Sequence, residues 1–117
     1  MAIYEHDMLL RVFDTFRALD EEATMLEYST MVEGGLVLDL HIWPYDEYAF
    51  VILWYPGKER WLLHVDVDFL KNIIHENDSL RIFRDEDKAE PSLVVTVKPH
   101  LSFSCGAKAP KERSGKF

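Results

Sequence analysis

The chain has 117 residues, of which 48% are hydrophobic, and a net charge of −8. This size suits one domain with one core, and we expect a single domain over residues 1–106. The longest uncharged apolar run is far shorter than the roughly 20 residues of a membrane helix, and the acidic N-terminus does not resemble a secretory signal. One cysteine, Cys105, cannot form an internal disulfide, so we expect a cytoplasmic protein that does not enter a membrane.

Charge is distributed unevenly along the chain. Residues 1–90 hold 20 acidic and 8 basic side chains, whereas residues 91–117 hold 1 and 5. An acidic body repels phosphate backbones, so we expect no direct binding of nucleic acid by the folded body. It favours a basic protein partner instead, although acidity also serves solubility alone. Residues 107–117 are basic and lack apolar periodicity, which predicts a mobile, disordered tail.

The first half of the chain predicts one helix and one hairpin. Apolar residues recur at helical spacing over residues 8–19, which predicts an amphipathic helix. Residues 26–32 combine helix-favouring and strand-favouring side chains. The pair Gly34-Gly35 decides for a hairpin, in which this segment is the antiparallel partner of a strand over residues 36–43.

The second half predicts four more strands and a second helix. Turn signals bound strands over residues 48–55 and 61–67, and the first of these has no charge, as in a central strand covered on both faces. An apolar stripe predicts a second amphipathic helix over residues 68–75, followed by strands over residues 80–84 and 93–98. The predicted fold class is α+β, mainly antiparallel sheet, in the order α-β-β-β-β-α-β-β.

Pairing across the three central strands divides their side chains between two faces, if both connecting loops have an even number of residues. One predicted face is mainly aliphatic and the other is aromatic. Two short helices can cover only one face, so the aromatic face is a candidate interaction surface. Alternatively, one helix lies on each face and the tryptophans are ordinary core, or a bulge changes the assignment. The aromatic face gathers Val37, Asp39, His41, Trp43, Tyr48, Phe50, Ile52, Trp54, Trp61, Leu63, Val65 and Val67.

Two histidine-aspartate pairs, Asp39 with His41 and His64 with Asp66, are the strongest candidates for chemistry. A carboxylate beside an imidazole can orient the ring as a base or as a metal ligand. The same pairing arithmetic places the two pairs on opposite faces, and each alone offers fewer ligands than the three or four of a zinc site. We find no nucleophile elbow and no glycine-rich phosphate loop. We therefore predict no catalytic residue, metal or cofactor.

The leading functional prediction is a non-catalytic, acidic protein-binding module, an inhibitor or antagonist of immunity type or encoded by a phage, that blocks a basic protein. One alternative is a small enzyme or ligand carrier that uses either histidine-aspartate pair. Another is a homodimer that buries the aromatic face. The size, acidity and helix-then-strands order also resemble type III secretion chaperones, without their long C-terminal helix. The predicted partner-binding residues are Trp43, Tyr48, Trp54, Trp61, Asp46, Glu47, Asp39 and His41.

Overall fold

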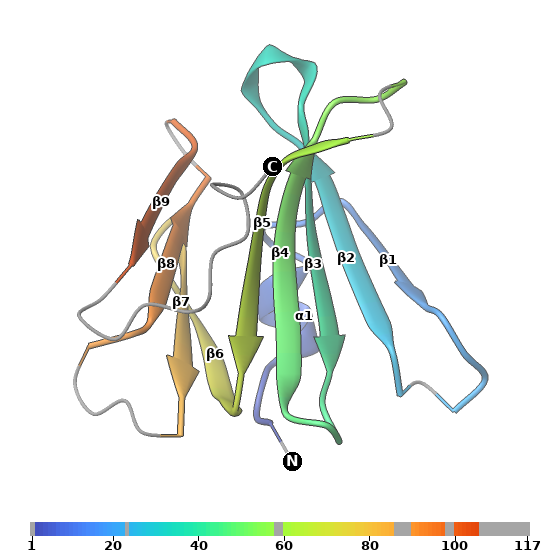
Figure 1. Ribbon diagram of the computed structural model, residues 1–117, viewed down its shortest axis with the longest axis vertical. Helices are drawn as coiled ribbons and strands as arrows, with labels where there is room; N and C mark the ends of the chain where they lie inside the picture. Colours follow the sequence, from blue (N-terminus) through green and yellow to red (C-terminus); the bar gives the residue numbers. More distant parts are fainter. Residues whose placement is uncertain (1, 23, 58–59, 86–89, 98–99, 106–117) are drawn as a thin grey trace.

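The fold consists of two antiparallel sheets and one short helix, seen in a computed structural model that describes residues 2–22, 24–57, 60–85, 90–97 and 100–105 (Figure 1). The first sheet has the strand order β1-β2-β3-β4-β5 and the second has the order β6-β7-β8-β9. The elements are α1 (His6–Leu9), β1 (Thr15–Ala18), β2 (Leu26–Met31), the 3-10 turn η1 (Glu33–Gly35), β3 (Val37–Trp43), β4 (Tyr48–Trp54), β5 (Trp61–Asp68), β6 (Leu70–Glu76), β7 (Ser79–Arg84), β8 (Leu93–Thr96) and β9 (Ser102–Cys105).

The predicted α+β class with two amphipathic helices is wrong. Strands hold 57% of the described residues, and no helix there reaches seven residues. Of the predicted helix over residues 8–19, only Met8 and Leu9 are helical, as the last two residues of α1. The chain then turns and enters β1. Leu9 and Phe13 are both buried, so their spacing of four reflects two anchors in the core on either side of a turn rather than one continuous helix.

The second predicted helix, over residues 68–75, is the strand β6. Its register with β7 passes from Leu70 opposite Arg84 to Asn72 opposite Phe83, which leaves Lys71 as the extra residue of a β-bulge. The bulge interrupts the period of two, so Leu70 and Ile73 both point into the core although they are three residues apart. A bulged strand has therefore produced an apolar spacing that resembles a helix turn.

The predicted hairpin around Gly34 and Gly35 is confirmed. Strands β2 and β3 pair in antiparallel register from Leu26 opposite Ile42 to Met31 opposite Val37. Both glycines have a φ of 77°, which L-residues with a side chain rarely adopt, so this tight connection requires glycine. The other predicted strands are also present, with ends that differ by a few residues.

One core joins the two sheets, and α1 lies behind the first sheet in the view of Figure 1. The second sheet thus occupies the place that the sequence assigned to helices. We call the side of the first sheet that lines this core the inner face. The buried cluster contains Leu9 and Phe13, the inner-face residues Leu26, Tyr28, Leu38, Leu40, Ile42, Ala49, Val51, Leu53, Val65 and Val67, and Leu70, Ile73, Leu80, Ile82, Leu93 and Val95 of the second sheet.

Backbone hydrogen bonds of the N-terminal segment connect the two sheets. The Ala2 N–H donates to the Pro44 carbonyl at 3.0 Å, beside the turn between β3 and β4. The Ile3 N–H donates to the Lys71 carbonyl at 2.9 Å, and the Ile3 carbonyl accepts from the Ile73 N–H at 3.0 Å. Ile3 thereby pairs with the edge of β6, and the segment ties the end of the first sheet to the second.

The C-terminal tail and the absence of a membrane-spanning helix were both predicted from the sequence. The predicted tail over residues 107–117 lies outside the described residues. In the part of the chain that the structure describes, no helix has both the length and the apolar character that crossing a membrane requires.

Burial of Tyr28 predicts a loss of stability at alkaline pH. Its hydroxyl is hydrogen-bonded to Nδ1 of His6 at 2.8 Å, and burial, followed by the nearby Tyr4, raises the pKa of Tyr28 well above its ordinary value of 10.0. The folded state keeps this phenol neutral while the unfolded chain ionises it. Its contribution is therefore complete below about pH 10 and decreases as the pH rises, by up to about 1.4 kcal/mol per pH unit.

A Tyr28→Phe variant should accordingly lose less stability than the wild type above about pH 10. The free energy of unfolding, measured by chemical denaturation between about pH 8 and 11, tests this expectation. Tyr55→Phe is the matched control, because it removes the same hydroxyl group from an exposed side chain. Equal slopes for Tyr28→Phe and the wild type would contradict the expectation.

Candidate functional site

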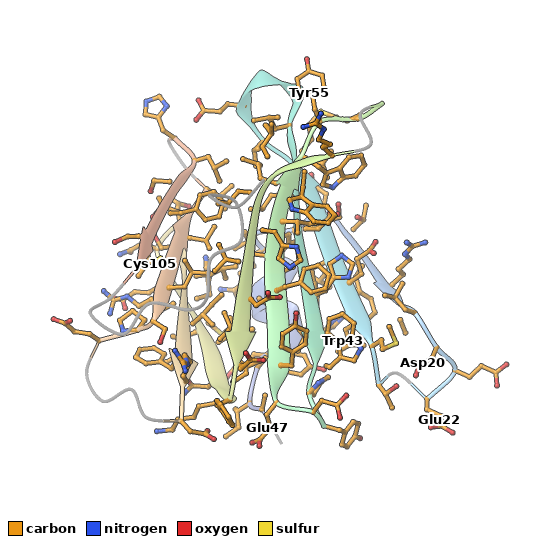
Figure 2. All side chains as sticks on the ribbon, viewed as in Figure 1. Asp20, Glu22, Trp43, Glu47, Tyr55 and Cys105 are labelled. Atoms are coloured by element: carbon orange, nitrogen blue, oxygen red, sulfur yellow. The ribbon has the colours of Figure 1, made fainter. Side chains whose placement is uncertain are left out.

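The candidate site is the outer face of the first sheet, the side directed away from the core. The register of β3 with β4 places Trp43 opposite Tyr48, His41 opposite Phe50 and Val37 opposite Trp54 on this face. Figure 1 looks onto it with α1 behind, and Figure 2 shows Trp43 on the same side of the sheet. Six of the eight predicted partner-binding residues lie on the outer face, namely Asp39, His41, Trp43, Tyr48, Trp54 and Trp61.

A bulge in β5 corrects the predicted assignment of that strand. Trp61 lies opposite Trp54, but Leu63 lies opposite Leu53, so Leu62 is an extra residue. After the bulge, each side chain of β5 points to the opposite face from the one predicted. Leu63, Val65 and Val67 are on the inner face, and His64, Asp66 and Asp68 are on the outer face. The prediction that the two histidine-aspartate pairs lie on opposite faces is therefore wrong.

Aromatic rings form a continuous cluster across the three strands of the outer face. His41 stacks on Phe50 with a centroid distance of 4.3 Å and an interplanar angle of 15°, and Phe50 is 4.9 Å from the His64 ring. Trp43 lies 5.4 Å from Phe50, and Trp61 meets His64 edge to face at 5.1 Å. These mutual contacts order the rings before any partner arrives, which lowers the entropy cost of binding.

Two buried carboxylates hold the aromatic cluster from within the face. Asp39 accepts hydrogen bonds from the Ser29 hydroxyl and from the Trp54 indole N–H, the latter at 2.7 Å. Asp66 accepts from the Tyr48 hydroxyl and from Nε2 of His64, the latter at 3.0 Å. Each carboxylate is thus engaged by a side chain of a neighbouring strand, and Asp66 also by His64 of its own strand, so both fix the orientation of the rings that surround them.

The geometry of His64 bears on the predicted enzyme alternative. Its Nε2 is bonded to Asp66, and its Nδ1 is buried and has no hydrogen-bond partner among the described residues. Neither ring nitrogen is therefore open to a substrate on the surface. Within the described ranges, no group of three or more His, Cys, Asp or Glu side chains is arranged to hold a metal ion.

His41 lies next to an ion pair, formed by Glu27 and Arg17, that was not predicted from the sequence. Its Nε2 is 3.5 Å from Glu27, whose carboxylate also accepts from Arg17 at 3.1 and 3.3 Å. Burial lowers the pKa of His41, and this effect outweighs the opposing influence of Glu27 and Asp39. The ring is therefore neutral at pH 7. Glu27 could have been found from the hairpin register, which places it directly opposite His41.

A hollow of about 260 Å³ opens at one end of the outer face. It lies beside the first residue of β5 and the last residue of β4, and the exposed Arg60 contributes to its wall. Its polar and aromatic lining residues are Glu27, Asp39, His41, Trp54, Arg60 and Trp61.

The remaining predicted binding residues, Asp46 and Glu47, lie in the turn between β3 and β4. Asp46 is exposed, and Glu47 has a φ of 51° and accepts the Leu70 N–H on its backbone carbonyl at 2.8 Å. Figure 2 places Glu47 and Tyr55 at opposite ends of β4. The acidic turn and the hollow therefore flank the aromatic cluster at its two ends.

Comparison of the chain with protein-family models, with curated proteins and with solved structures finds no match. Its function is therefore argued from the geometry and chemistry of the outer face.

Proposed function

We propose that this protein is a non-catalytic protein-binding module of the cytoplasm that engages a basic protein through the outer face of its first sheet. The observation that carries the proposal is the aromatic cluster. Trp43, Tyr48, Phe50 and Trp54 are half-buried and Trp61 is 41% exposed, on a sheet whose opposite face is core. A contiguous, partly exposed aromatic surface is a candidate interaction site, and tryptophan and tyrosine are enriched among residues that dominate binding energy.

Charge supports a basic partner. Residues 1–90, which include every strand of the first sheet, have 12 more acidic than basic side chains. Asp46 and Glu47 border the aromatic cluster, and such a field attracts positively charged proteins over long distances. A module that covers a functional surface of its target in this way acts as an inhibitor or antagonist, as immunity proteins and phage-encoded inhibitors do.

The contacts of the histidine-aspartate pairs favour this proposal over a small enzyme or ligand carrier. His64 and Asp66 bond each other and Tyr48, and Asp39 bonds Ser29 and Trp54. These side chains organise the aromatic surface. The resemblance to type III secretion chaperones relied on size, acidity and a helix-then-strands order, and the initial helix α1 has only four residues.

Affinity capture with matched variants tests the proposal. The immobilised wild type should retain one basic protein from a lysate of its own cells, and the folded Trp43→Ala/Trp61→Ala double variant should not. Ile74→Ala is the control, because Ile74 is 40% exposed, close to the exposure of Trp61, and lies on the second sheet. Equal capture by the double variant would contradict the proposal. A wild type that retains no protein but forms a dimer, which the Trp43→Ala/Trp61→Ala variant does not form, would instead make the outer face a homodimer interface.

A further inference from the structure

We propose that the hollow between Trp54 and Trp61 receives an arginine side chain of the basic partner, and that Asp39 is the carboxylate that pairs with its guanidinium. This inference rests on the proposed function, since it identifies the chemical group that the outer face recognises. It goes further by assigning cation recognition to one end of the face, where His41 and Trp61 of the aromatic cluster line the hollow.

The size of the hollow suits one side chain. Its volume of about 260 Å³ is below the range of about 300–1,000 Å³ that is typical of pockets for drug-sized molecules. A single extended side chain fits in such a space. The hollow also lies on the exposed side of the sheet, where a protruding residue of a partner can enter.

The walls of the hollow suit a planar cation. Trp54 is fixed by its indole bond to Asp39 at 2.7 Å, and Trp61 is held at 5.1 Å from His64 with an interplanar angle of 71°. Tryptophan is the aromatic residue that attracts cations most strongly. A guanidinium can stack on an indole face while it directs N–H groups at a carboxylate, which a lysine ammonium does less well.

The charge of Asp39 is available to such a cation. Asp39 is only 7% exposed, and both of its hydrogen bonds come from neutral donors, a hydroxyl and an indole N–H. It makes no ion pair with any residue that the structure describes. The neighbouring Glu27 differs, because Arg17 already neutralises it. His41 is neutral at pH 7 and therefore does not offset the charge of Asp39.

Substitution of Arg60 tests whether the ligand of the hollow carries a positive or a negative charge. It is exposed and lines the same hollow, so it repels a cation and attracts an anion. Replacing Arg60 with alanine should strengthen the binding of an arginine peptide by roughly two- to fivefold, the size expected of one exposed charge interaction. If the hollow bound a carboxylate or phosphate through Arg60, the same substitution would weaken binding.

The probe is the peptide acetyl-Gly-Arg-Gly-amide, and its control is the same peptide with citrulline, which keeps the shape and removes the charge. Binding is followed by the NMR signals of the three indole N–H groups. The arginine peptide should shift the Trp54 and Trp61 signals saturably, with a dissociation constant in the millimolar range, and should shift the Trp43 signal less, because Trp43 touches the hollow only through His41. The citrulline peptide should bind roughly tenfold more weakly.

Two further variants locate the contact. Asp39→Asn should weaken the arginine peptide roughly tenfold and Trp61→Ala roughly fivefold. Asp39 also organises Ser29 and Trp54, so Trp61→Ala, at an exposed position, keeps the test valid if Asp39→Asn is unstable. Equal affinity for both peptides, or no shift at a concentration of roughly 50 mM, would overturn the inference. A stable dimer that excludes the peptide would also overturn it, because a second copy would then occupy the hollow.

The proposed function and the arginine site are contradicted by different results. Trp43 does not line the hollow, although it stacks on His41, which does, so Trp43→Ala should weaken capture of the basic protein far more than it changes peptide affinity. Loss of capture together with equal binding of both peptides would reject the arginine site and retain the proposed function. Discrimination between the peptides by a wild type that captures no basic protein would do the reverse.

Discussion

A Val95→Asp variant is expected to be unfolded, whereas Val94→Asp is expected to fold. Val95 is buried in the core and lies opposite Leu80 and Phe103. An aspartate there would bury a charge with no partner, at a cost of several kcal/mol, which is comparable with the roughly 5–15 kcal/mol that stabilises an ordinary domain. Circular dichroism and thermal unfolding measure this effect.

Val94 is the matched control, because it has the same side chain in the next position of the same strand. It points to the outside of the second sheet, opposite Arg81 on β7. An aspartate there would face a cation, so the free energy of unfolding should stay within about 1 kcal/mol of the wild type. Similar losses in the two variants, or a wild-type melting temperature for Val95→Asp, would contradict the packing of β8 against the first sheet.

The strands of the first sheet could be predicted because their local signals agree. The Gly34-Gly35 pair marks the β2–β3 hairpin, and an uncharged run forms β4. The register between β3 and β4 follows from an even-numbered turn, so the positions of Trp43 and Tyr48 on one face were also predictable. Propensity and alternation suffice where a strand pairs regularly with its neighbour in sequence.

The second sheet could not be predicted to the same extent because its first strand is irregular. The bulge at Lys71 makes Leu70 and Ile73 both point inward, and no local feature distinguishes this spacing from a helical one. The pairing of β6 with Ile3 depends on residues far apart in sequence. Long-range contacts of this kind override propensity, and a single sequence does not contain them.

The candidate site was predictable only in part, because a second bulge changes which side chains belong to it. A bulge at Leu62 transfers His64 and Asp66 to the outer face, where they join the cluster around Phe50. Because one extra residue reverses every later side chain of a strand, the arithmetic that correctly placed Trp61 failed two residues further on, at Leu63. The hollow depends on this bulge and on Arg60, and could not be anticipated from the sequence.

The acidic turn should determine how fast the basic partner associates. Asp46→Asn/Glu47→Gln should slow association and flatten its dependence on salt, since long-range attraction acts before the surfaces touch. Glu21→Gln/Glu22→Gln changes the net charge equally in the loop between β1 and β2, outside the β3–β4 turn, and should slow association less. Equal slowing by both variants would assign the effect to net charge alone.

The dissociation rate of the Trp43→Ala/Trp61→Ala variant from the captured partner tests the central claim most directly. If the outer face is the binding surface, truncating these side chains removes packed contact, which acts after association and therefore changes the off-rate. Surface kinetics should show dissociation accelerated by roughly 30-fold or more, equivalent to the 2 kcal/mol or more of a binding hot spot, with association within about threefold of the wild type. A folded double variant that dissociates at the wild-type rate would show that the partner binds elsewhere on the molecule.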